Sequence, residues 1–184
     1  MRILQVKQWH IGAAVVLFAM TLLPHVSYAQ PFGVGVFGED VPFGDETSLS
    51  IDLSAEAEVP LAPSGGTFSG SDTHTVTVTS SDVVGYGLYA HTTTATDMSN
   101  GTDSIPASGN ATLAPLNTNT WGYNTTGSTT NFRGMSGTQA LLHSATGPYT
   151  GGDATDVTYG ALIDITKSAG TYSVDVTYTA VGQT

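Results

Sequence analysis

Several stretches of the chain alternate between apolar and polar residues, and this two-residue period is the feature that most constrains the fold. In THTVTVTS, His74, Val76 and Val78 fall on one side and threonines on the other. TYSVDVTYTAV, residues 171–181, repeats the pattern with Tyr172 to Ala180. A period of two places successive side chains on opposite faces of a β-strand. We therefore expect strands with one buried face and one threonine-covered wet face.

Three further stretches carry the same signal, and together they indicate the fold class. They are SLSIDLS at 48–54, VVGYGLYAH at 83–91 and ATDVTYGALIDI at 154–165, with Val84 and Ile165 expected on the buried faces. Threonine, valine and tyrosine suit pleated, half-buried surfaces, and no stretch after residue 29 has a helical period. Short strands spaced by about 8 to 12 residues are typical of an all-β, antiparallel sandwich.

The pairing of the strands is less constrained than their faces. TKSAG separates the last two alternating stretches, so we expect residues 156–165 and the terminal strand to form a hairpin. Shorter strands are expected near 111–113, 121–123 and 139–143, in a middle region where glycines mark turns.

The first 29 residues have the pattern of a secretory signal peptide. Arg2 and Lys7 precede an apolar run at 11–23, and Ser27-Tyr28-Ala29 resembles a cleavage site. The run is shorter than the roughly 20 residues of a membrane-spanning helix, so a retained anchor is the weaker alternative. We expect cleavage between Ala29 and Gln30, a Gly/Phe/Pro lead-in segment at 30–47 and a sandwich domain at 48–184.

The net charge restricts which classes of partner we expect, and the cysteine content restricts how the fold is stabilised. Loss of the leader leaves two basic residues against 15 acidic ones, a net charge of −13. Such a surface repels phosphate backbones and anionic lipids, which argues against nucleic-acid binding and against stable membrane association. The chain has no cysteine, so an exported form would be stabilised by packing rather than by disulfides.

Three stretches together resemble a known class of domain. VTVTSSDVVGYGLYA, NTWGYNTTGSTTNFRGM and VTYGALIDITKSAGTYSVDVTYTAV are similar to the threonine-rich, immunoglobulin-like β-sandwich domains of exported bacterial cell-surface proteins. The resemblance spans residues 73–181 and implies a secreted or cell-surface structural or adhesive protein, with no catalytic residue to carry over. We therefore expect a noncatalytic protein without a cofactor or a bound metal.

Aromatic residues provide the alternative function. Trp121 and Tyr123 alternate in NTWGYN, and with Tyr149 they could form a platform that stacks on sugar rings. A lone tryptophan in a sandwich is more often a core residue, so carbohydrate binding is the second hypothesis. His74 is expected to be a core histidine bonded to a backbone group. Asn100, Asn110 and Asn124 begin N-x-S/T sequences, which matter only in a glycosylating host.

The lead-in segment suggests how copies of the protein could join. Phe32, Val34 and Val36 share one face of QPFGVGVFG, and such a segment could add a strand to a sheet edge of its own domain or of a neighbour. The expected partners are therefore the protein itself, other surface proteins or glycans.

Overall fold

The computed structural model describes residues 2–5 and 47–183, and within these residues every regular element is a β-strand. The predicted all-β, antiparallel class is therefore confirmed. The predicted cleavage point at Ala29 and Gln30 lies outside the described residues, as do Phe32, Val34 and Val36 of the lead-in segment.

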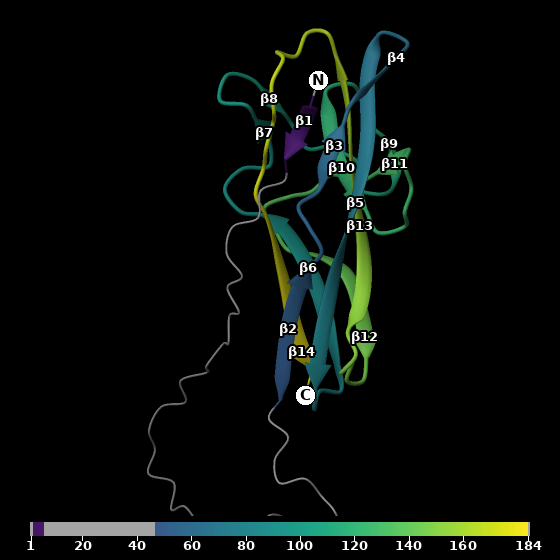
Figure 1. The fold of residues 1–184 in the computed structure, drawn as a ribbon, viewed down its shortest axis with the longest axis vertical. Coiled ribbons are helices and arrows are strands. Elements are labelled where there is room, and N and C mark those ends of the chain that lie inside the picture. The colour runs from purple at the N-terminus through teal and green to yellow at the C-terminus, as the bar shows by residue number, and fades with distance from the viewer. Residues whose placement is uncertain (1, 6–46, 184) are drawn as a thin grey trace, which may run out of the picture.

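Two larger sheets form the body of the molecule. One orders β10 (Thr120–Asn124), β13 (Asp153–Asp164), β5 (Thr67–Ser81) and β2 (Ser48–Leu53), and β4 (Ala62–Ser64) also pairs with β5. The other orders β12 (Ala140–Thr146), β6 (Gly85–Thr92) and β14 (Val176–Gln183). All of these ladders are antiparallel. In Figure 1, β5 and β13 follow the long axis and β12, β6 and β14 lie at the lower end.

Three small two-stranded sheets lie toward the upper end (Figure 1). They pair β7 (Met98–Ser99) with β8 (Ser104–Ile105), β9 (Ala114–Pro115) with β11 (Asn131–Phe132), and β1 (Arg2–Gln5) with β3 (Glu58–Pro60). β1 belongs to the predicted leader, so cleavage after Ala29 would remove it from the mature protein. The expected strands near 121–123 and 139–143 correspond to β10 and β12, whereas residues 111–113 are not in a strand.

The core begins between the two larger sheets, where the period of two predicted it, and continues beyond them to small-sheet residues such as Met98 and Ile105. The inward side chains of β5, β6 and β13 are buried, and those of β2 pack partly against them. Burying such side chains stabilises the fold by about 1.5–3 kcal/mol each. The fully buried set includes Val76, Val78, Tyr86, Leu88, Ala90, Val157, Tyr159 and Ile163.

Two residues expected on buried faces are exposed, and in both cases the strand stops short of them. Val84 is 64% exposed, because Asp82 takes a left-handed turn (φ 52°) and β6 begins only at Gly85. Ile165 is 81% exposed, because β13 ends at Asp164, whose carboxylate accepts hydrogen bonds from the backbone and hydroxyl of Thr166. Strand ends are set by turn chemistry, which the alternation does not encode.

The predicted terminal hairpin is wrong. β13 pairs with β5 and β10, whereas β14 pairs with β6 in the other sheet. The chain crosses the sandwich in the loop at 165–175, so the inward faces of β13 and β14 meet across the core. The Tyr159 and Tyr178 hydroxyls lie 2.6 Å apart there. The alternation predicts which face of a strand is buried. It does not predict whether the next strand in the sequence pairs with it in the same sheet or lies in the opposite sheet.

Two facing glycines explain the WGY and TYGA patterns. Gly122 and Gly160 are register partners on β10 and β13, between inward-facing aromatic residues. Phe132 of β11 packs over this point, and a Cβ at Gly160 would lie 2.3 Å from the tip of its ring. Phe132 is 3% exposed. The glycines therefore leave room for a second layer on the outer face of the sheet.

We expect Gly160→Ala to lower the free energy of unfolding by about 1–3 kcal/mol, because the added methyl forces Phe132 from its place. Gly137→Ala is the matched control, since no atom of residues 2–5 or 47–183 lies within 4 Å of a Cβ there. Urea unfolding measures both, and Phe132→Leu should recover part of the loss in the double variant. Equal stability of Gly160→Ala and Gly137→Ala would contradict this packing.

Candidate functional site

A hydrogen-bonded chain of three ring side chains crosses the core. His74 Nδ1 lies 3.0 Å from the carbonyl oxygen of Ala55, and His74 Nε2 lies 2.6 Å from the Tyr178 hydroxyl. The Tyr178 hydroxyl is also 2.6 Å from that of Tyr159. The chain joins β5, β14 and β13, and it confirms His74 as a core histidine bonded to a backbone group.

The donors of this chain run in one direction. A carbonyl oxygen only accepts, so His74 Nδ1 carries the proton and Nε2 accepts from Tyr178. Tyr159 then donates to Tyr178. Burial lowers the pKa of His74, against the opposing effects of the Ala55 carbonyl and Asp72. Burial also raises the pKa of the Tyr159 and Tyr178 hydroxyls, so all three rings are neutral at pH 7.

A second cluster lies between β12 and β13. Asp153 Oδ2 accepts a hydrogen bond from the Tyr86 hydroxyl at 2.7 Å and lies 3.1 Å from His143 Nε2. Burial raises the pKa of Tyr86, and the bond to Asp153 adds to this. In the described part of the chain, Asp153 is the partner of the His143 ring. This polar cluster therefore joins the two larger sheets through side-chain hydrogen bonds.

An open depression of about 500 Å³ lies beside this cluster. β10 ends at Asn124, opposite Thr158, and the depression lies where β13 continues beyond that point. The Thr155 hydroxyl is buried and has no hydrogen-bond partner among the residues that the structure describes. The surrounding chemistry is polar and supplies hydroxyls, one carboxylate and one imidazole. The lining residues are Thr73, Thr125, Thr126, Gly127, His143, Ala154, Thr155 and Asp156.

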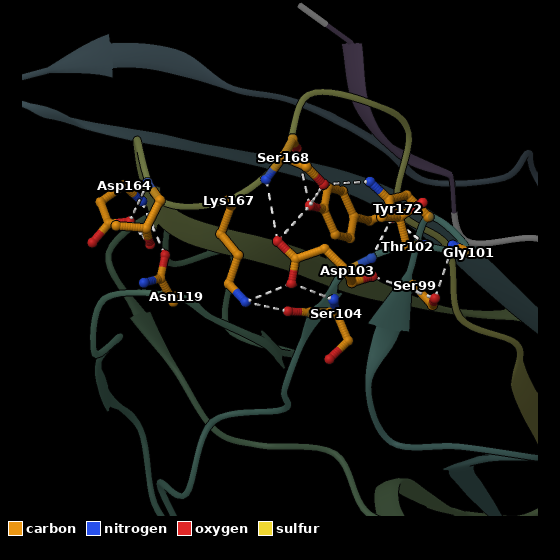
Figure 2. A network of polar contacts seen from close by, with 12 residues as sticks. Ser99, Gly101, Thr102, Asp103, Ser104, Asn119, Asp164, Lys167, Ser168 and Tyr172 are labelled. Carbon is orange, nitrogen blue, oxygen red and sulfur yellow. Dashed lines mark hydrogen bonds and ion pairs between the residues drawn. The ribbon is translucent and has the colours of Figure 1, made fainter.

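A third cluster centres on Asp103 and holds the loop that crosses the sandwich. Figure 2 shows Asp103 between Lys167 and Ser168 of this loop, with the Lys167 ammonium 3.0 Å from one carboxylate oxygen. The other oxygen accepts from the Ser168 amide and from the Tyr172 hydroxyl. The bond from Lys167, with those from the Ser168 and Ser104 amides, lowers the pKa of Asp103 to about 2. The Asp103 carboxylate is therefore ionised at neutral pH.

The aromatic residues of the carbohydrate hypothesis are not brought together. Trp121 is 0% exposed and its Nε1 donates to the carbonyl of Thr96. Tyr123 is 1% exposed, with the guanidinium of Arg133 over its ring. Tyr149 is half-buried and lies at the other end of the β5–β13 pair, where its amide bonds to Ser80. Trp121 thus agrees with the core alternative, and the three rings form no common exposed platform.

Two of the three N-x-S/T asparagines hold loops in place through hydrogen bonds from their side-chain amides. The amide nitrogen of Asn110 donates to the carbonyls of Ala114, Pro115 and Phe132. Asn124 is 1% exposed, and its amide nitrogen donates to backbone carbonyls at 128 and 131. A glycan would have to join these same nitrogens, so the folded domain does not offer them.

The described residues contain no group of three or more histidine and acidic side chains placed to hold a metal ion. Among the same residues, none forms a helix with the length and apolar character needed to cross a bilayer. Comparison with protein-family models, curated proteins and solved structures finds no match to this chain.

We expect the stability of the domain to fall as pH drops below about 6.5, where an unfolded histidine gains a proton that buried His74 resists. The unfolded chain binds more protons in that range, so stability rises with pH. His74→Phe should flatten this slope in urea unfolding measured from pH 8 to pH 5. Tyr178→Phe, which keeps the imidazole, should retain it. Equal slopes for the unmodified protein and His74→Phe would contradict the assignment.

Thr155→Val should raise the free energy of unfolding by about 1 kcal/mol, because it removes a buried hydroxyl that has no hydrogen-bond partner in the described part of the chain. Thr158→Val on the same strand is the control. Its buried hydroxyl lies 2.8 Å from that of Thr73, so its loss should destabilise the domain. Thermal unfolding compares the two variants, and destabilisation by both would show that the Thr155 hydroxyl is satisfied.

Proposed function

We propose that the chain is a noncatalytic, secreted or cell-surface protein with a structural or adhesive role, built on an immunoglobulin-like sandwich. The observation that carries this proposal is the use made of its ionisable side chains. Both ring nitrogens of His74 are hydrogen-bonded inside the core, and His143 is bonded to Asp153. Lys167 is bonded to Asp103. These three groups, which could carry acid–base chemistry, are thus used to join layers and loops.

The sequence supports the compartment. The basic start, the apolar run at 11–23 and the small residues at 27 and 29 are the three parts of a secretory leader. A cysteine-free chain also withstands changes in redox conditions outside the cell, because its fold depends on packing and hydrogen bonds alone. The resemblance of residues 73–181 to bacterial surface domains agrees with this location.

The test of this proposal is the form of the protein found on cells that produce it. We expect brief protease treatment of intact cells to release peptides of the 48–184 domain, and the mature chain to begin at Gln30 by mass spectrometry. Ala29→Leu should block processing, because the cleavage site requires a small residue there, whereas Gln30→Ala should not. Recovery of the chain only after lysis, or with residues 1–29 intact, would refute the secreted form.

A further inference from the structure

The charges of the described domain are distributed unevenly between its two larger sheets. β6, β12 and β14 contain no aspartate, glutamate, lysine or arginine along their whole length. The acidic residues of the larger strands are instead on the other sheet, at Asp52, Asp72, Asp153, Asp156 and Asp164. A chain with 15 acidic residues therefore keeps one sheet free of them.

The outward side of this uncharged sheet carries apolar side chains. Leu141 of β12 and Val181 of β14 are each 49% exposed. Leu141 is the register partner of Tyr89 on the central strand β6, and Val181 is the partner of Gly87. The Tyr89 ring lies over Gly87, 2.9 Å from where a Cβ would be, so it bridges the two positions. Together, Leu141, Tyr89 and Val181 form one apolar stripe across the three strands, which we call the outer stripe.

We propose that the outer stripe is a contact surface between two copies of this chain, packed face to face about a twofold axis. The partner in this contact is a second copy of the chain. The contact rests on the proposed function only in that the copies meet at a cell surface. Two copies that meet through these three strands bring no strand carboxylates together and keep their acidic sheets on the outside. Charged side chains close to these strands include Arg133, which donates to the carbonyl of Leu141, and Asp175, which directly precedes β14. A pairing through the other larger sheet would instead place the carboxylates of its strands in the contact, where repulsion opposes it.

The size of the surface sets the strength of the contact. The three strands have seven to eight residues each. With a strand spacing near 4.8 Å and a rise near 3.4 Å per residue, the face of this sheet has an area of about 350 Å² per copy. The pair would bury about 700 Å², which is below the roughly 1,200 Å² of stable complexes. We therefore expect weak, concentration-dependent association that becomes effective when copies are held close together, as on a surface.

Sedimentation velocity over a range of concentrations tests the contact with the protein lacking its leader. We expect reversible dimers that become more abundant as salt screens the repulsion between acidic copies. Leu141→Glu and Val181→Glu should each weaken association roughly tenfold or more, because they place a charge in the contact. Ile165→Glu is the control, since it adds the same charge at a side chain that is 81% exposed and lies off the stripe.

Amide chemical shifts of the unmodified protein at low and high concentration give a second measurement that needs no substitution. Shifts should move on β6, β12 and β14 and stay constant on β2. A protein that remains monomeric at every concentration overturns the proposal, as does equal weakening by Ile165→Glu and the two stripe variants. Either result leaves the secreted form intact, because that rests on protease accessibility and on the mature N-terminus.

Discussion

The hydrogen bonds from Tyr159 through Tyr178 to His74 fix how the two sheets sit on each other. Within each sheet the backbone ladder sets the register, but apolar contacts between sheets are non-directional and tolerate sliding. A buried hydroxyl left without a partner costs about 1–3 kcal/mol, so only a narrow range of positions keeps all three rings satisfied. This series of hydrogen bonds ends at the carbonyl oxygen of Ala55, so it also positions the segment between β2 and β3.

The alternating sequence specified the buried faces well and the strand partners poorly. Val76, Tyr86 and Tyr159 are buried because side-chain direction depends only on local backbone geometry. The partner of a strand depends on loops and on contacts far apart in the chain. Lys167 and Asp103, 64 residues apart, hold the loop that takes the chain from β13 to β14, and no local signal links them.

The polar clusters show the same limit. Tyr86 and Asp153 are 67 residues apart, and their contact follows from the stacking of two sheets rather than from a motif. Trp121 had two interpretations because the WGY pattern fits both a core and a platform, and its neighbour Gly122 settles the geometry through the close approach of β11. Asn110 and Asn124 begin a glycosylation pattern, yet the same residue type closes loops through its own amide.

Threonine and serine allow the sheets to carry few charges and still present wet faces. Hydroxyl pairs join Thr73 of β5 to Thr158 of β13, and Thr93, directly after β6, to Thr177 of β14. Such pairs satisfy polar groups within the surface and add to strand pairing without fixed charge. A strand pair joined in this way needs no aspartate or lysine for its stability, so acidic residues can be confined to one side. The uneven charge that makes the outer stripe a suitable contact thus follows from the choice of hydroxyl residues for the exposed sides of the strands.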